Sequence, residues 1–171
     1  MSRLVRELEN VLGARIVRGA PVSRLERDGD AWIVDGARAD AVVLATPSYV
    51  SATLLREVAP RASAALASID YAGVALVSMA FPRDGIGVPL DASGFLVPKT
   101  EKCTLTACSW TSSKWAHLDQ GAHAILRASA GHYGNEAALA LDDDALVAAM
   151  LDELTQIMSI STEPVEVRVS R

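Results

Sequence analysis

The 171-residue sequence lacks several features that would place it in a broad class of proteins. It has only two cysteines, Cys103 and Cys108, which is too few for a disulfide framework. Its longest apolar runs, such as residues 41–46 and 73–81, are far shorter than the roughly 20 residues of a transmembrane helix. The N-terminus has no hydrophobic segment of a signal peptide. These absences favour a soluble, cytoplasmic protein.

Positive charge is also in short supply. Lysine and arginine number 16 against 21 aspartates and glutamates, so the net charge is −5. Nucleic acid is therefore not an expected partner, because phosphate binding needs a basic surface. Hydrophobic residues make up 50% and charged residues 22% of the chain, which is enough apolar surface for a packed core.

Self-contained catalytic motifs are missing as well. The sequence has no glycine-rich dinucleotide fingerprint, phosphate-binding loop, nucleophile elbow or zinc motif. We therefore assign no catalytic residue and no metal site from the sequence. By themselves, the residues indicate a soluble domain of mixed α/β structure and no particular reaction.

The first 68 residues predict one helix, then three short strands, then two further helices. A helix is predicted at residues 3–12 from its apolar spacing, and Gly13 ends it. Alternating or apolar runs predict strands at residues 21–26, 31–34 and 40–45. The run at 40–45 is almost wholly apolar, which is typical of a strand buried on both faces. Helices are expected at residues 48–56, with Ser48 as a cap, and at 60–68, with Pro60 in the first turn.

The remainder predicts an antiparallel sheet and one long helix, and hence a mixed α+β fold. Strands are expected at residues 73–81, 94–98, 104–110, 122–130 and 165–169, with a polar loop at 111–121. Three aspartates at 142–144 open a helix at 143–158, where they favour the positive end of the helix dipole. Its apolar stripe comprises Leu146, Met150, Leu154, Ile157 and Met158.

Several polar groups have a simple structural interpretation beside a functional one. The histidines at 117, 123 and 132 lack the spacing of a helical zinc site. The aspartates at 142–144 are explained by helix capping more readily than by a metal. Trp110 and Trp115 flank Lys114, either as a ligand wall or cation–π pair or as ordinary packing.

Two stretches of sequence resemble a known family. Residues 19–22, 32–34 and 39–47 resemble the middle of the flavin-dependent amine oxidase and protoporphyrinogen oxidase superfamily. The segments SGFLVP (93–98), LTACSWTSSKW (105–115) and LRASAG (126–131) resemble the bacterial, HemY-type porphyrinogen oxidases more specifically. The resemblance covers essentially the whole chain, but the family's N-terminal glycine-rich motif and C-terminal FAD-contacting segment are not in it.

The resemblance implies a section of an FAD- and oxygen-dependent porphyrinogen oxidase of haem biosynthesis. It implies a partial FAD-binding domain at residues 1–57 and a substrate-binding domain at 58–171. Val22, Thr46 and Pro47 match positions at the cofactor.

For the substrate, the resemblance implies that Gly94 and Leu96 line the porphyrinogen slot. Phe95 between them is a candidate substrate contact, with ordinary core packing as the alternative. Lys114 and Arg127 are cations that could pair with propionates, and Arg127 could instead form a structural ion pair.

Alternatives remain open at this point. Soluble composition favours coproporphyrinogen III over protoporphyrinogen IX as the substrate. Another flavin amine oxidase or desaturase, and a non-catalytic degenerate module, are the competing readings. Peripheral membrane contact of a longer parent protein is left open. If segments outside the chain cover the apolar face of helix 143–158, the isolated chain should dimerise through that face.

Overall fold

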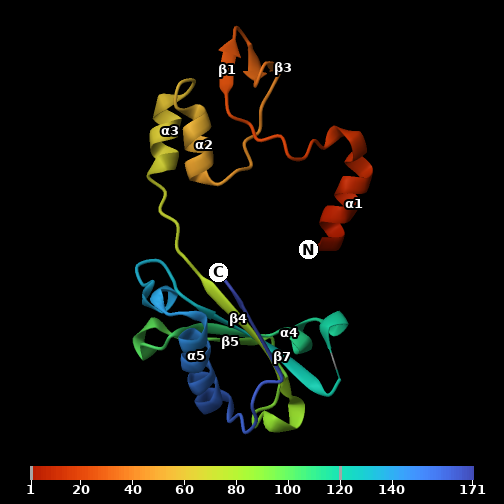
Figure 1. The fold of residues 1–171 in the computed structure, drawn as a ribbon, viewed down its shortest axis with the longest axis vertical. Helices are drawn as coiled ribbons and strands as arrows, with labels where there is room; N and C mark the ends of the chain where they lie inside the picture. The colour runs from red at the N-terminus through yellow and green to blue at the C-terminus, as the bar shows by residue number, and fades with distance from the viewer. Residues whose placement is uncertain (1, 120) are drawn as a thin grey trace. The chain divides into compact units, whose positions relative to one another are not determined.

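The computed structural model describes residues 2–119 and 121–171, which form two compact units, Met1–Asp70 and Tyr71–Arg171 (Figure 1). The first unit contains helices and a small sheet, and the second contains a larger sheet with a long helix. The mixed α+β class predicted from the sequence is confirmed. Among the described residues, no helix combines the length and apolar character needed to cross a membrane.

The first unit is built around a three-stranded antiparallel sheet. Helix α1 (Ser2–Leu12) and a short 3-10 turn, η1 (Gly13–Arg15), precede it. The strands are β1 (Leu25–Asp28), β2 (Ala31–Val34) and β3 (Ala37–Ala39), and helices α2 (Ser48–Leu55) and α3 (Pro60–Ala67) follow. The predicted helices are confirmed, including Pro60 in the first turn of α3.

Two strand predictions in this unit are wrong. Residues 40–45 form no strand, and Val43 among them is 90% exposed. An apolar run becomes a buried strand only where neighbouring strands pair with it, and no described strand of this chain does so. The strand predicted at 21–26 begins only at Leu25. Ser48 is not a cap either, because Pro47 occupies the N-cap position and Ser48 lies inside α2.

The second unit is a five-stranded antiparallel sheet in the order β5-β6-β7-β4-β8. Its strands are β4 (Ala75–Pro82), β5 (Gly94–Leu96), β6 (Leu105–Trp110), β7 (His123–Ala130) and β8 (Glu166–Ser170). The connections contain the 3-10 turns η2 (Arg83–Gly85), η3 (Lys99–Glu101), η4 (Ala116–Leu118) and η5 (Ala137–Ala140). All five strands predicted in this region are present, and the three interior ones, β6, β7 and β4, have neighbours on both sides.

Helix α5 (Asp143–Met158) covers one face of this sheet (Figure 1). Its bounds match the prediction, and the Asp142 carboxylate caps it by accepting a hydrogen bond from the Ala145 backbone N–H at 2.8 Å. The buried stripe packs against alternate residues of β4, β6 and β7; its members, at 0–1% exposure, are Leu146, Met150, Leu154 and Met158. Burial of four such side chains stabilises the unit by several kcal/mol, at about 1.5–3 kcal/mol each.

The packing of α5 corrects two expectations. Ile157 is 43% exposed and does not belong to the buried stripe. The apolar face of α5 is covered by its own sheet, so the reason given for dimerisation through that face no longer holds.

The segment 111–121 is not wholly a loop, because it contains the short helix α4 (Thr111–Lys114) and η4.

Candidate functional site: the open face of the five-stranded sheet

Within the described second unit, one face of the sheet lies under α5. The opposite face has only the short α4–η4 segment at its rim, and we call it the open face. Side chains alternate along a strand, so the register identifies the members of each face. In β4, Val77, Met79 and Phe81 are buried towards α5, while Ser78 and Ala80 between them are on the open face. Polar residues that the sequence scatters over five strands are therefore gathered on one surface.

The floor of the open face is built mainly from small side chains. One row runs across all five strands and consists of Gly94, Ser109, Arg127, Ser78 and Arg168. The adjacent row contains Ala107 and Ser129 beside two leucines. Small residues in neighbouring positions leave a flat surface, on which a planar ligand can lie in close contact with the backbone.

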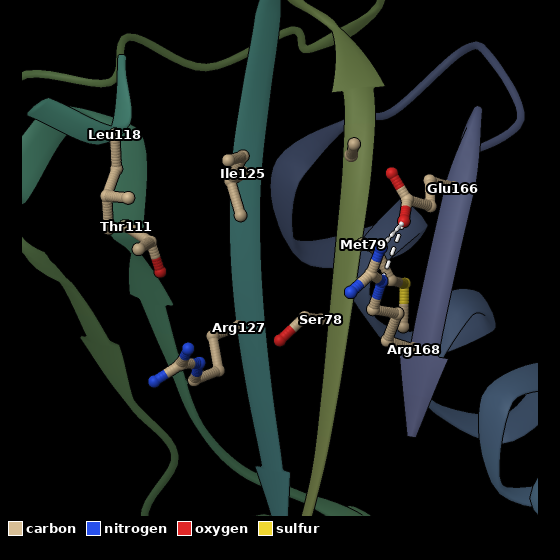
Figure 2. Close-up of a pocket in the computed structure, with 9 residues that line it drawn as sticks. Ser78, Met79, Thr111, Leu118, Ile125, Arg127, Glu166 and Arg168 are labelled. Atoms are coloured by element: carbon tan, nitrogen blue, oxygen red, sulfur yellow. Dashed lines mark hydrogen bonds and ion pairs between the residues drawn. The ribbon is translucent and has the colours of Figure 1, made fainter. Parts of the chain in front are cut away.

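A pocket of about 290 Å³ lies over the middle of this face (Figure 2). It combines apolar contacts with a few polar groups, which is the usual character of a small-molecule site. Its lining comprises Ser78, Met79, Ala80, Thr111, Leu118, Ile125, Arg127, Glu166 and Arg168.

Arg127 is the unusual residue of this pocket. It lies in the middle of the central strand β7, with serines opposite it on both neighbours, Ser109 on β6 and Ser78 on β4. The other arginines of the described second unit are paired: Arg83 with Asp119, Arg168 with Glu166, and Arg171 with Asp143. The Arg127 side chain has no ion pair or hydrogen bond among the described residues, and Figure 2 draws no contact from its guanidinium to the other residues that line the pocket. Its charge is therefore available to an anionic group of a ligand.

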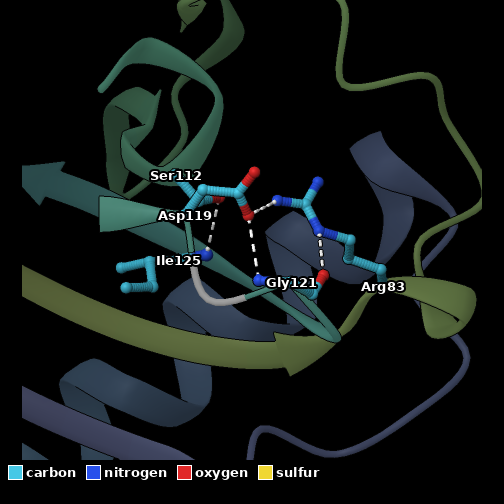
Figure 3. Close-up of polar contacts among 5 residues, drawn as sticks. All are labelled: Arg83, Ser112, Asp119, Gly121 and Ile125. Carbon is cyan, nitrogen blue, oxygen red and sulfur yellow. Dashed lines mark hydrogen bonds and ion pairs between the residues drawn. The ribbon is translucent and has the colours of Figure 1, made fainter. Parts of the chain in front are cut away.

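One rim of the pocket is formed by the α4–η4 segment, which is tied to the sheet by polar contacts (Figure 3). Ser112 accepts a hydrogen bond from the Ile125 backbone N–H at 3.1 Å. Arg83 donates to Asp119 at 2.6 Å and to the Gly121 carbonyl at 2.7 Å. The Gly121 N–H and the Arg83 guanidinium hold the pKa of Asp119 below its ordinary value. These bonds fix the rim without using Arg127.

The structure separates the three neighbouring residues predicted to line the slot. Gly94 and Leu96 are on the open face, where Leu96 is 83% exposed. Phe95 lies opposite Cys108 and packs against the core under α5, which is the core alternative left open above. Gly94 also has a structural reason to be glycine, because its φ is +136° and an added Cβ would lie 2.1 Å from the Cys108 carbonyl oxygen.

Lys114 is not part of the pocket. It is exposed at the end of α4, and its Nζ lies 5.8 Å from the centroid of the Trp115 ring, which is the geometry of a cation–π contact. Trp110, by contrast, is 9% exposed and belongs to the core. The two tryptophans therefore do not form a common wall around Lys114.

The residues predicted at the cofactor lie in the first unit. Val22 precedes β1 and is outside the sheet. Thr46 and Pro47 form the start of α2, where the Thr46 Oγ1 lies 2.7 Å from the Ser51 Oγ and the Pro47 carbonyl accepts hydrogen bonds from the first turn. None of the three is among the lining residues of the pocket beside β1, which include Ser23, Leu25 and Leu54.

Asp35, which sequence reasoning missed, fixes the chain next to Val22. Its carboxylate accepts hydrogen bonds from the backbone N–H groups of Ser23, at 3.0 Å, and Arg24, at 2.8 Å, and from the Ser23 hydroxyl at 2.9 Å. These bonds, chiefly those from Ser23, hold the pKa of Asp35 below its ordinary value. The sequence signal for this role is an aspartate directly before a glycine, which is typical of a tight turn.

The thiols and acidic groups offer no obvious second site. Cys108 is buried, and desolvation raises the pKa of its thiol to about 12. Within residues 2–119 and 121–171, no three His, Cys, Asp or Glu side chains are grouped as metal ligands.

Ser78, Glu166 and Arg168 were also missed as site residues. The alternation of small and large residues in β4 was the signal for Ser78. The pairing of β8 with β4, which places Arg168 beside Ser78, is not encoded in any local motif.

The chain thus combines a five-stranded antiparallel sheet covered by one helix with a smaller sheet-and-helix unit. Residues 1–171 match the family described as flavin containing amine oxidoreductase. The chain belongs to this family.

Its relatives include coproporphyrinogen III oxidases. That of Bacillus subtilis (strain 168) is 28% identical over 177 residues, covering 100% of this chain and 37% of the relative. That of Mycobacterium tuberculosis (strain ATCC 25618 / H37Rv) is 39% identical over 157 residues, covering 89% and 33%. The chain thus spans about a third of the length of these curated relatives.

Solved structures agree on the fold. A candidate protoporphyrinogen oxidase from Exiguobacterium sp. 255-15 superposes with a TM-score of 0.79 at 27% identity, over 99% of this chain and 38% of its own. A putrescine oxidase superposes with a TM-score of 0.76 over 100% of this chain and 38% of its own, at 16% identity, which is a likeness of fold alone.

Proposed function

We propose that this chain is a section of an FAD- and oxygen-dependent oxidase that converts coproporphyrinogen III to coproporphyrin III. Its second unit binds the porphyrinogen on the open face of the sheet. The observation that carries the proposal is a flat floor of small residues with one unpaired guanidinium, Arg127, in its middle. A tetrapyrrole macrocycle with carboxylate side chains needs both features, a broad surface to lie on and a cation to orient it.

The named relatives support the choice of substrate. Coproporphyrinogen III oxidases from several bacteria match most of this chain, up to 39% identical. Coproporphyrinogen carries four propionates and protoporphyrinogen two, so an open face with cationic groups suits the former well. We keep coproporphyrinogen III as the preferred substrate and protoporphyrinogen IX as the alternative.

The residues of the first unit fit a role at a flavin. Val22 lies outside the sheet, so its backbone is not committed to a neighbouring strand, and Asp35 holds the adjacent Ser23 and Arg24 in place. When bound, FAD would accept hydrogen from the macrocycle and pass the electrons to O₂. Val22, Thr46 and Pro47 would then contact it, and residues 1–57 would form part of its domain.

The proposal also covers the affinity of the chain for FAD, its location in the cell and nucleic acid as a partner. The chain by itself should bind FAD weakly, because the glycine-rich phosphate-binding turn is not in its sequence. We place the protein in the cytoplasm and leave peripheral membrane contact to experiment. We propose no nucleic-acid partner.

Porphyrin fluorescence tests the function directly. The full gene product, supplied with FAD and O₂, should form coproporphyrin from coproporphyrinogen III faster than protoporphyrin from protoporphyrinogen IX, both measured against spontaneous oxidation. Faster protoporphyrin formation would assign the enzyme to the alternative substrate. Formation of neither above the spontaneous rate would reject porphyrinogen oxidation.

A further inference from the structure

The pocket on the open face contains a second guanidinium besides Arg127. Arg168 on β8 and Arg127 on β7 occupy the same row, with Ser78 of β4 between them. Adjacent strands are about 4.8 Å apart, so the two arginine backbones are about 10 Å apart. Two cations at this separation, with a hydroxyl between them, can bind two carboxylates of one ligand.

Arg168 differs from Arg127 in having an internal partner. Its Nε and Nη2 both lie 2.7 Å from the Glu166 Oε1, two residues away on the same strand (Figure 2). The side chains of Arg168 and Glu166 are 78% and 58% exposed. An ion pair this exposed is weak because water screens it, so another carboxylate can replace Glu166 at low cost.

Glu166 is also the only carboxylate among the residues that line this pocket. It neutralises Arg168 and leaves Arg127 as the uncompensated charge. A ligand with a single carboxylate would be bound by Arg127, whereas a second carboxylate must displace Glu166.

We propose that Arg127 and Arg168 bind two carboxylates of the same ligand, and that Glu166 competes with the second carboxylate for Arg168. This inference rests on the proposed function, in which the ligand is a porphyrinogen with several propionates. Arg168 is then a substrate-binding residue, and Glu166 sets how tightly carboxylates are bound.

Binding of coproporphyrin III to the full gene product, followed by the shift of the porphyrin absorbance, tests the proposal. Its tetramethyl ester, which has no carboxylates, is the matched control ligand. Replacing either arginine, Arg127→Gln or Arg168→Gln, should weaken coproporphyrin III about tenfold, the loss expected for one charge-assisted contact, and leave the ester unchanged. Lys99→Gln, on η3 outside the pocket lining, is the control substitution and should change neither.

Glu166→Gln gives the sharper result. It should tighten coproporphyrin III by several-fold, because Arg168 loses its charged competitor. The gain should disappear when Glu166→Gln is combined with Arg168→Gln. Unchanged or weakened binding in Glu166→Gln, or a gain that persists without Arg168, would overturn the proposal.

The porphyrinogen turnover described above separates this proposal from the function on which it rests. Normal turnover together with arginine variants that bind coproporphyrin III like the unmodified protein refutes only the two-carboxylate site. Absence of turnover refutes the function, even where binding depends on both arginines.

Discussion

Replacing Glu153 by glutamine should destabilise the second unit by more than a surface change on the same helix. The Glu153 carboxylate reaches from α5 to the start of β6, where its two oxygens accept hydrogen bonds from the backbone N–H groups of Thr104, at 2.7 Å, and Leu105, at 2.8 Å. Leu105 is 1% exposed, so its N–H has little access to water. Glu153 therefore joins the helix to the sheet through a partly buried carboxylate that accepts two hydrogen bonds.

Glutamine keeps the shape of this side chain but has only one acceptor oxygen. One of the two N–H groups would then face an NH₂ donor and stay unsatisfied, which costs about 1–3 kcal/mol. The remaining bond also loses its charge. We expect a total loss of about 2 kcal/mol, which lowers the melting temperature of a unit of this size by about 10 °C.

Thermal unfolding of the chain, followed by near-ultraviolet circular dichroism, measures this effect. The matched control is Asp152→Asn, the next residue on α5, whose exposed carboxylate accepts a hydrogen bond from the Gln156 Nε2 at 2.9 Å. The control should cost about 0.5 kcal/mol or less. Equal losses in the two variants would refute the assignment of Glu153 as an anchor.

Three further predictions concern a glycine, a turn and a thiol. Gly94→Ala should lower the free energy of unfolding, measured by urea denaturation, by about 3 kcal/mol, because the added Cβ meets β6 at a φ of +136°. Gly134→Ala, with open space around the added Cβ, should lower it by about 1 kcal/mol. Equal losses in the two variants would contradict the clash at Gly94. Asp35→Asn should lower the melting temperature at pH 7. Because folding lowers the Asp35 pKa, its carboxylate stabilises the folded chain above the unfolded pKa near 4, and this stabilisation is lost as the pH falls through the folded pKa. The difference in melting temperature between Asp35→Asn and the unmodified chain should therefore shrink in acid. A difference that stays constant with pH would contradict this linkage. A thiol reagent at pH 8 should leave buried Cys108 unmodified until denaturant is added, and its rapid labelling in the native chain would contradict its burial.

The sequence predicted much of the second unit because its local patterns and its packing agree. The aspartates before α5, its apolar spacing and the alternation in β4 all point to the observed elements. Prediction fails where the local sequence pattern indicates a strand but no neighbouring strand pairs with it. Residues 40–45 have the composition of a buried strand but find no described partner, so they stay exposed.

The candidate site was predicted only in part for the same reason. Arg127 was predicted from the resemblance as a cation that could pair with propionates, and the structure places it in the lining of the pocket. Ser78 and Arg168 come to it only through the register of β7, β4 and β8, which no local motif specifies. Lys114 looked equivalent to Arg127 in the sequence, but α4 leaves it outside the pocket lining.

The structure of the full gene product crystallised with coproporphyrin III tests the central claim most directly. Our account predicts that the macrocycle lies on the open face, over Ser78, Ala107 and Ser129, with one propionate at Arg127 and another at Arg168. A macrocycle bound away from this sheet, or propionates directed away from both arginines, would contradict it.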